Sequence, residues 1–401
     1  MQTEQSKTQY SSAWIMLLAL LTSLGPLSID MYLPALPQMA HDFGVSTQMI
    51  ANTLPAYFLG LAVGQLIYGP VSDRIGRKIP LYFGLILYTV ASLLCFSVQN
   101  EWSLIAARVL QALGGCVGVV IARATIRDRL DMQASAQAFS SMMIVMGIAP
   151  IIAPTLGSWI LKFFSWHAVF GALSLMGLFC LVCVHFFFKE SLPVSKRLKL
   201  SFKQVLLLYV TIFKDSSFRL PMVIGCFSGA LLFCYISSSP AVLMDSYGLT
   251  QQQFAYAFGA NAFGIMLFST FNKHLAANTT VMQRLKIGGY IQLAGVLILL
   301  MSAVLYAEAP LMAVMLGMFL TVSGIGFTGP NAMALAMSEQ GARAGTASAV
   351  MGSMQFGCGL LGGLILNFMF WSALLNMAAV MLLFIIVVLY AIRKIQPKAL
   401  A

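Results

Sequence analysis

The sequence predicts an all-α integral membrane protein in which twelve transmembrane helices form two six-helix halves. Composition is the first reason: 60% of the 401 residues are apolar, only 9% are charged, and the mean hydropathy is +0.88. A soluble domain carries about 25% charged residues. The other two reasons are twelve apolar runs of membrane-spanning length and a resemblance between the second six runs and the first six. Together they exclude an ordinary soluble enzyme, a nucleic-acid-binding protein and a disordered chain.

Each apolar run is expected to form one membrane-spanning helix. At about 1.5 Å per residue, every run reaches across about 30 Å of hydrocarbon. The first six runs lie at residues 13–38, 49–71, 79–98, 102–122, 136–161 and 167–188. The second six lie at residues 219–243, 252–272, 285–306, 311–336, 345–368 and 371–392. The polar, basic stretch at residues 189–218 is the expected cytoplasmic connector, and the two halves are residues 1–188 and 219–401.

The basic residues indicate how the bundle is oriented. With the N- and C-termini in the cytoplasm, the inner loops and tails hold 21 of the 23 Lys and Arg residues, as the positive-inside rule requires. The outer loops then hold only Lys162. The net charge of +11 is therefore a topology signal and does not indicate nucleic-acid binding. The seven cysteines all lie inside apolar runs, so we expect no disulfide framework and no metal site.

An internal repeat supports the division into halves. Residues 146–157 in the fifth run resemble residues 351–362 in the eleventh at a spacing of 205 residues, and residues 43–48 resemble residues 247–252 at a spacing of 204. Both matches place each run opposite the run six further along the chain. Two parallel six-helix halves are a transporter architecture, with the binding site near the membrane midplane. Chance similarity between glycine-rich runs is the alternative explanation.

Away from the ends of the apolar runs, two charged residues lie inside them, Asp30 in the first and Arg108 in the fourth. An ionised side chain at such depth costs a few kcal/mol, so each is a candidate functional residue with a partner. Counting along the helices places both about 10 Å below the outer surface, level with each other and opposed. Asp30 is the only carboxylate in the runs, so we expect proton coupling to depend on it. A purely structural ion pair is the alternative.

The second half is expected to contribute neutral groups to a substrate cavity, because no charged residue lies inside its runs away from their ends. The chain is also rich in Phe, Tyr and Met, whose ring and thioether surfaces accommodate varied apolar molecules. Lipid contact or ordinary packing is the alternative for each aromatic residue taken singly. The residues expected to line the cavity are Tyr32, Tyr57, Tyr235, Tyr256, Asn261, Asn331, Gln355 and Phe356.

Several segments resemble the major facilitator superfamily, and within it the drug:proton antiporters of the bicyclomycin and chloramphenicol resistance (Bcr/CflA) group. Residues 69–78, Gly-Pro-Val-Ser-Asp-Arg-Ile-Gly-Arg-Lys, are similar to the superfamily's G-x-L-x-D-R-x-G-R-K loop, with Val71 in place of Leu. Residues 28–37 resemble the first-span fingerprint of the Bcr/CflA group. Residues 108–114 resemble the fourth-span R-x-x-Q-G motif, although two residues separate the glutamine from the glycine.

The resemblance implies roles for the matching residues. Asp30 would be the proton-coupling carboxylate, and Arg108 its membrane-buried partner in coupling. The 69–78 loop, joined by residues 127–128, would form an inner gate that steadies the outward-facing form. Its motif residues are Gly69, Asp73, Arg74, Gly76, Arg77 and Lys78. A role of these basic residues in topology alone is the alternative. The fifth run resembles the antiporter motif, with Ser158 where a second glycine is common, and its motif residues are Gly147, Pro150, Pro154 and Gly157.

The resemblance also implies the major facilitator fold and transport rather than an enzyme. We expect a proton-coupled multidrug efflux protein that exports small apolar or aromatic antibiotics, chloramphenicol- or bicyclomycin-like, by alternating access. Its partners would be the drug, protons and the lipid bilayer, with no nucleic acid and no cofactor, and the proton gradient would drive it. We expect a multi-pass monomer in the bacterial cytoplasmic (inner) membrane. A proton-coupled uptake symporter for a small neutral nutrient is the alternative, whereas a membrane-embedded enzyme lacks the convergent titratable residues that it would need.

Overall fold

The computed structural model describes residues 12–130, 132–197, 202–306, 308–340 and 344–395. In these segments every regular element is a helix. Eleven helices are long and apolar enough to cross a membrane, and a shorter apolar helical segment, Gly147–Phe163, supplies the remaining span. The prediction of an all-α membrane protein with twelve spans is therefore confirmed, while the cytoplasmic location of both termini stays a prediction.

The first half contains six spans, two of them divided into shorter helices. The first span is divided after Asp30, and the second is divided at Asn52. The elements are α1 (Ser12–Asp30), η1 (Leu33–Ala35), α2 (Leu36–Phe43), α3 (Thr47–Ala51), α4 (Thr53–Ile75), α5 (Lys78–Ser97), α6 (Glu101–Arg129), α7 (Met132–Phe163) and α8 (His167–Phe187).

The second half also contains six spans. The tenth span is divided at Gly324, and the seventh continues past Pro240 into the wider turn η3. The elements are α10 (Ser216–Pro240), η3 (Ala241–Ser246), α11 (Gln251–Leu275), α12 (Val281–Leu305), α13 (Leu311–Ser323), α14 (Ile325–Met337), α15 (Ala344–Asn367) and α16 (Ala373–Lys394).

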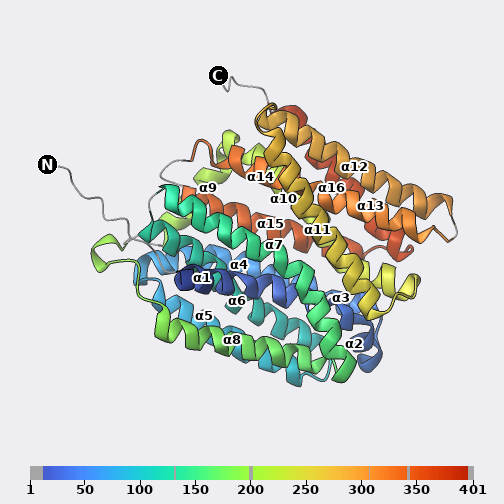
Figure 1. Ribbon diagram of the computed structural model, residues 1–401, viewed down its shortest axis with the longest axis horizontal. Coiled ribbons are helices and arrows are strands. Elements are labelled where there is room, and N and C mark those ends of the chain that lie inside the picture. The colour runs from blue at the N-terminus through green and yellow to red at the C-terminus, as the bar shows by residue number, and fades with distance from the viewer. Residues whose placement is uncertain (1–11, 131, 198–201, 307, 341–343, 396–401) are drawn as a thin grey trace.

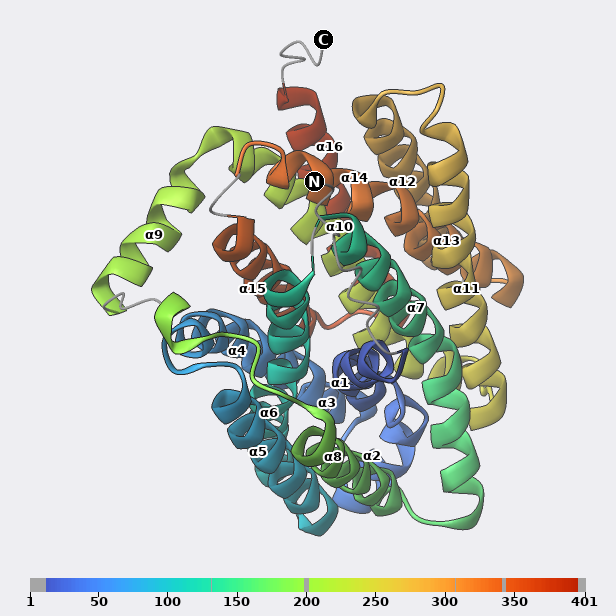
Figure 2. The same cartoon turned by 60° about the vertical axis from the view of Figure 1, so that its left-hand side comes forward.

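The two halves lie side by side in one bundle (Figures 1 and 2). Helices α1 to α8, coloured blue to green, gather on one side, and helices α10 to α16, coloured yellow to red, gather on the other. Helix α4 packs against α15 across the boundary, and α7 packs against α11. These two pairs form the contact surface along which the halves meet.

The connector forms more than the polar stretch expected from the sequence. It contains the short turn η2 (Val194–Lys196) and a 13-residue helix, α9 (Phe202–Lys214). The run of mostly apolar residues from Val205 to Val210 explains the helix, because aliphatic and aromatic side chains there can pack against the bundle.

The break in the first span follows from its prolines. Helix α1 ends at Asp30, and Leu33–Ala35 continues as a tighter helical turn. Pro34 supplies no backbone N–H, and a proline disfavours helical geometry in the residue before it. The break therefore exposes backbone groups and redirects the side chains on either side of it.

Glycines hold α6 close to its neighbours. A side-chain carbon at Gly60 of α4 would collide with the backbone of Val109 in α6, and one at Gly118 of α6 would collide with the carbonyl of Leu21 in α1. Such close approach is available only where a helix carries small residues. Helix α6 is therefore held between α1 and α4, and this places Arg108 in the interior.

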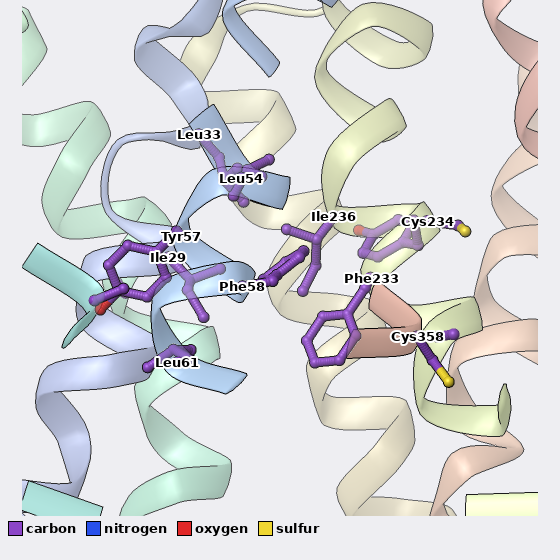
Figure 3. Packing of buried hydrophobic residues seen from close by; sticks show 14 of the residues in the cluster. Ile29, Leu33, Leu54, Tyr57, Phe58, Leu61, Phe233, Cys234, Ile236 and Cys358 are labelled. Atoms are coloured by element: carbon purple, nitrogen blue, oxygen red, sulfur yellow. The ribbon is translucent and has the colours of Figure 1, made fainter. Parts of the chain in front are cut away.

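Aromatic rings fill the centre of the boundary between the halves (Figure 3). The ring centroids of Phe58 in α4 and Phe233 in α10 are 4.4 Å apart. The ring of Phe356 in α15 lies 6.2 Å from that of Phe58 and 5.4 Å from that of Phe233. The three rings provide an apolar surface shared by both halves.

Candidate functional site

Asp30 lies at the break in the first span and is buried, with 3% of its surface exposed. Among the described residues none forms a hydrogen bond with its Oδ1, and no cationic side chain lies within ion-pair distance. The turn η1, which begins three residues after Asp30, packs against α10 and α11 of the second half. The only predicted intramembrane carboxylate therefore faces the boundary between the halves without a cation beside it.

Arg108 is fully buried in α6 and is surrounded by aromatic rings. The centre of its guanidinium lies 4.3 Å from the ring centroid of Tyr32 and 4.2 Å from that of Tyr57. Its Nη1 donates to Oε1 of Gln111 at 2.5 Å, and Nε2 of Gln111 donates in turn to Ser92 at 2.8 Å. Among the described residues its Nε and Nη2 have no hydrogen-bond partner. The cation is stabilised by ring faces instead of by an anion.

The expected ion pair between Asp30 and Arg108 is not formed in the described part of the chain. The rings of Tyr32 and Tyr57 are the physical reason, because they lie against the guanidinium of Arg108 where a carboxylate would have to approach. Tyr32 also shares a hydrogen bond with Thr53. The prediction of an ion pair was therefore wrong, while the equal depth of the two residues stays a prediction.

Tyr235 and Asn261 form the polar part of the site in the second half. The Nδ2 of Asn261 donates to the hydroxyl of Tyr235 at 2.8 Å, while Oδ1 of Asn261 has no partner among the described residues. The ring of Phe258 stacks on that of Tyr235 with centroids 5.3 Å apart. The amide of Gln355 in α15 lies beside Gly229 of α10. Tyr235 and Asn261, which were predicted to line the substrate cavity, therefore both lie in the interior of the bundle.

Tyr256 does not line an interior cavity, contrary to expectation. It is 59% exposed on α11, and its hydroxyl accepts a hydrogen bond from Gln252 at 2.8 Å. The next turn of the same helix carries Asn261, whose side chain is directed inward. Asn261 lies on the inward face of α11 and Tyr256 does not. Composition alone does not show which face of a helix points inward.

Asn331 belongs to a structural cluster and not to the expected cavity. Its Oδ1 accepts from Nε of Arg284 at 3.1 Å, and its Nδ2 donates to Oδ1 of Asn272 at 2.7 Å. Arg284 also donates to the carbonyl of Thr279 at 2.7 Å and is only 8% exposed. The expectation that the second half buries no charge was therefore wrong. Helix α12 begins at Val281, before the apolar run, and so carries Arg284 into the bundle.

The 69–78 loop forms a charged cluster around Arg77, which is 4% exposed. Arg77 donates to Asp73 at 2.6 Å, to Ser72 at 2.7 Å and to both carboxylate oxygens of Asp128 at 2.8 and 3.2 Å. Burial works to lower the pKa of Arg77, but the carboxylates of Asp128 and Asp73 hold this pKa above its ordinary value. Asp128, at the end of α6, thus ties the loop to the helix that carries Arg108.

Glu190, just after α8, is part of this cluster and has no recognisable signal in the sequence. Its carboxylate accepts from the backbone N–H groups of Arg77 and Lys78 at 2.9 and 3.1 Å. Partial burial works to raise the pKa of Glu190, but hydrogen bonds from backbone N–H groups, that of Arg77 foremost, hold it below its ordinary value. The turn needs glycine at Gly76, where φ is 101° and a side chain would meet Glu190. In the sequence, Glu190 looks like any solvated loop residue, because it is a charged residue that follows an apolar run.

The other residues of the loop motif make fewer contacts. Arg74 is exposed, and no atom lies near a side chain added at Gly69. The ammonium group of Lys78 lies 5.8 Å from the ring centroid of Tyr82. The structure therefore brings Asp73, Gly76 and Arg77 together. Gly69, Arg74 and the ammonium group of Lys78 lie at the edge of the cluster.

The antiporter-motif residues lie on α7, which crosses the break in the first span. Pro150 and Pro154 are inside the helix. A side-chain carbon at Gly157 would collide with the carbonyl of Met31, whereas nothing lies near one added at Gly147. Gly157 thus allows α7 to touch the backbone directly after Asp30, so the motif is physically linked to the candidate coupling residue.

The superfamily is settled by comparison with known proteins. The sequence profile described as Major Facilitator Superfamily matches residues 18–363. The chain belongs to the major facilitator superfamily. This confirms the resemblance noted in the sequence, and it makes the chain a multi-pass membrane transporter and not an enzyme.

Several curated superfamily members match most of the chain. An MFS-type transporter of Bacillus subtilis, YdgK, is 34% identical over 87% of this chain and 86% of its own length. A bicyclomycin resistance protein homolog of Haemophilus influenzae is 29% identical over 87% of both chains. The multidrug resistance protein MdtL of Escherichia coli O9:H4 is 30% identical over 84% of both. All three are bacterial proteins, in agreement with a location in the cytoplasmic membrane.

Solved structures support the superfamily fold. The peptide transporter POT, crystallised with sulfate, aligns with a TM-score of 0.74 at 13% sequence identity and covers 94% of this chain and 93% of its own. At that identity the likeness concerns the fold alone. The shared fold therefore does not identify what this chain transports.

Proposed function

We propose that this superfamily member exports small apolar or aromatic antibiotics in exchange for protons, by alternating access. Similarity to the Haemophilus influenzae bicyclomycin resistance homolog and to MdtL supports drug efflux. The observation that carries the proton coupling is the buried carboxyl group of Asp30, which has no cation beside it and lies at the boundary between the halves. A group at this boundary changes its surroundings whenever the halves move.

Protonation of Asp30 would then follow conformation. A buried carboxylate with neither a cation nor a full set of donors costs several kcal/mol, so the protonated acid suits the arrangement in the structure. When the halves rearrange, water or the free donors of Arg108 can stabilise the carboxylate, and the proton leaves. Loading of the drug and loading of the proton would thereby favour different conformations.

The substrate would occupy the aromatic surface between the halves. The rings of Phe58, Phe233 and Phe356 offer apolar contact. The hydroxyl of Tyr57 and Oδ1 of Asn261 are buried and lack hydrogen-bond partners among the described residues, so a rearrangement that exposes them would offer two free polar groups to a ligand. Ligand sites commonly combine apolar walls with a few such polar groups. A small neutral antibiotic with hydroxyl or amide groups, chloramphenicol- or bicyclomycin-like, matches this chemistry.

The membrane potential would supply useful work for such an exchange. One proton moving inward down 100 mV releases about 2.3 kcal/mol, which sustains roughly a fifty-fold gradient of a neutral drug. Exchange of one monovalent cation for one proton moves no net charge and would depend on the pH gradient alone. The voltage dependence therefore distinguishes a neutral from a cationic substrate.

The test is drug transport in everted vesicles with an imposed pH gradient, comparing the parent with Asp30→Asn. Asparagine keeps the shape of the side chain but cannot ionise, so we expect pH-driven accumulation of chloramphenicol to fall at least about tenfold, equivalent to about 1.4 kcal/mol. The matched control is Asp42→Asn, because Asp42 is 41% exposed and an asparagine oxygen can still accept from Trp166. Full pH-driven transport by Asp30→Asn would refute the coupling role. Movement of drug and protons in the same direction would instead establish symport.

A further inference from the structure

The connector helix α9 lies along the boundary between the two halves. Val205 and Ile212 are buried on its inner face. The hydroxyl of Tyr209 donates to the carbonyl of Leu66 in α4 at 2.9 Å, and α9 also packs against α15. Figure 2 shows α9 at the edge of the bundle beside α15. The helix therefore contacts both halves and is not a free linker.

The outer face of α9 is apolar as well. Leu206, Leu207, Val210 and Phe213 are each between 42% and 57% exposed. A helix at a water boundary places polar residues on its outer face, and a helix that is apolar all round is covered on all sides. In the described part of the chain nothing covers this face. The exposed apolar side chains on the outer face of α9 therefore require an apolar environment outside the described part of the protein.

The depth of α9 places it at the membrane. Leu66 lies nine residues before Ile75, where α4 ends, so Tyr209 reaches about 14 Å along α4 from its end. Only a two-residue turn then separates α4 from α5. With 13 residues, α9 is about 20 Å long and too short to cross about 30 Å of hydrocarbon. It must lie along the bilayer and not through it.

Basic residues mark both ends of α9. Lys203 lies at its start and Lys214 is its last residue, and both are exposed. Apart from Tyr209, whose hydroxyl is bonded to α4, the only other polar residues between them are Gln204 and Thr211. An apolar outer face flanked by lysines is the pattern of a helix that lies in the headgroup region of an anionic leaflet.

We propose that α9 is embedded in the headgroup region of the cytoplasmic leaflet and binds anionic phospholipid. The outer side chains Leu206, Leu207, Val210 and Phe213 contact acyl chains, and Lys203 and Lys214 bind lipid phosphate groups. Because α9 contacts both α4 and α15, bound lipid lies directly against the boundary between the halves. The site is independent of the drug and proton sites proposed above.

The first experiment measures what surrounds the outer face. Spin labels at Leu207→Cys and Val210→Cys, with Cys183→Ser to remove the one half-buried native thiol, are compared in phosphatidylglycerol vesicles for collision with oxygen and with a water-soluble nickel complex. Reference labels are Ile86→Cys, on the exposed face of α5 about 12 Å from its start, and Asn278→Cys, in a loop. We expect the α9 labels to match Ile86→Cys. A match to Asn278→Cys would place the face in water and overturn the proposal.

The same labels test the competing occupant, a second copy of the chain. Contact between copies would broaden the spectra through spin–spin interaction, and dilution with unlabelled protein would remove that broadening. Such a result would overturn the lipid assignment, because the apolar face would then be a protein interface. We expect spectra that dilution does not change.

The second experiment measures the lipid directly. Protein purified from vesicles of equal phosphatidylglycerol and phosphatidylcholine is analysed by native mass spectrometry for retained phosphatidylglycerol. Lys203→Gln with Lys214→Gln should lower this retention, by roughly fivefold for each lysine. The matched control is Lys273→Gln with Lys286→Gln, two exposed lysines outside α9. Equal losses in the two variants, or no loss in either, would overturn the lysine assignment. Neither readout requires drug transport, so failure here is separate from failure of the proposed function.

Discussion

Arg108 is a buried cation that depends on aromatic rings in the described structure. Contacts with Tyr32 and Tyr57 at 4.3 and 4.2 Å are close enough to contribute about 1 to 2 kcal/mol each in a desolvated site. They offset part of the cost of burying the charge, and the hydrogen bond to Gln111 offsets more. Two of its three donor nitrogens, Nε and Nη2, have no partner among the described residues. Arg108 can therefore gain an anionic partner in another conformation without first giving up a strong ion pair.

We predict that Arg108→Gln inserts normally but loses pH-driven efflux. Glutamine can still pair with Gln111, but it carries no charge to stabilise a carboxylate, so transport should fall at least about tenfold. The measurement is vesicle efflux normalised to the amount of folded protein. Arg219→Gln, at an exposed position in α10, is the matched control and should transport normally. Unchanged efflux by Arg108→Gln would leave Arg108 only a packing role.

Single residues with an unusual chemical character could be predicted from the sequence, whereas their contacts could not. Asp30 and Arg108 stand out because a charge inside an apolar run is rare and costly. The absence of an ion pair between them in the described structure could not be foreseen, since it depends on the rings of Tyr32 and Tyr57 that cover Arg108. Tyr235 and Tyr256 carry the same chemistry, yet one is 1% and the other 59% exposed. The difference in exposure depends on how each helix is rotated about its axis, which directs Tyr235 into the bundle and Tyr256 out of it.

At the scale of elements, the crossing of α7 over the first span is the contact that links two motifs. Gly157 brings α7 onto the carbonyl of Met31, one residue beyond Asp30. The broken backbone there cannot use ordinary helical hydrogen bonds throughout, so its position depends on the neighbouring helix. Any displacement of α7 at Gly157 therefore moves the candidate coupling residue.

We predict that Gly157→Ala lowers stability and transport, whereas Gly147→Ala does not. The added methyl group at residue 157 meets a backbone carbonyl that cannot rotate away, which costs about 1 to 3 kcal/mol. The same methyl group at residue 147 meets nothing and slightly favours the helix. Thermal unfolding in detergent should show a lower Tm for Gly157→Ala only. Equal Tm values for the two variants would show that the α7 contact is loose.

Element positions followed from hydropathy, but their ends and the connector helix did not. The fourth run was predicted at residues 102–122, and α6 extends to Arg129 because its last turns carry polar side chains that bind the loop cluster. Hydropathy marks where a helix enters the bilayer, not where its hydrogen bonds stop. Helix α9 was missed because its 13 residues are too few for a span and its flanks are basic.

At the scale of the whole molecule, the α4–α15 contact runs along most of the boundary between the halves. A side chain at Gly363 would collide with Pro55, and one at Gly352 would collide with Gln65. Ten residues separate Pro55 from Gln65, so the contact is at least about 15 Å long. Further along, Gly345 lies against the guanidinium of Arg127. Alternating access requires the halves to rotate against each other, and this contact must then slip or open at one end.

We predict that a crosslink across this contact stops transport. In Gln65→Cys with Gly352→Cys, the shorter side chain at residue 65 makes room for the new one at residue 352, and a short thiol crosslinker can join them. Efflux should fall at least about tenfold on crosslinking and recover when the link is cleaved. The control is Phe96→Cys with Gly171→Cys, since a side-chain carbon at residue 171 of α8 would lie 3.4 Å from the ring of Phe96 in α5, within the first half. A link inside one half leaves the relative motion of the halves free, so this variant should keep its activity. Undiminished efflux by the fully crosslinked α4–α15 variant would mean that the halves do not move at this contact, and the alternating-access proposal would then need a different hinge.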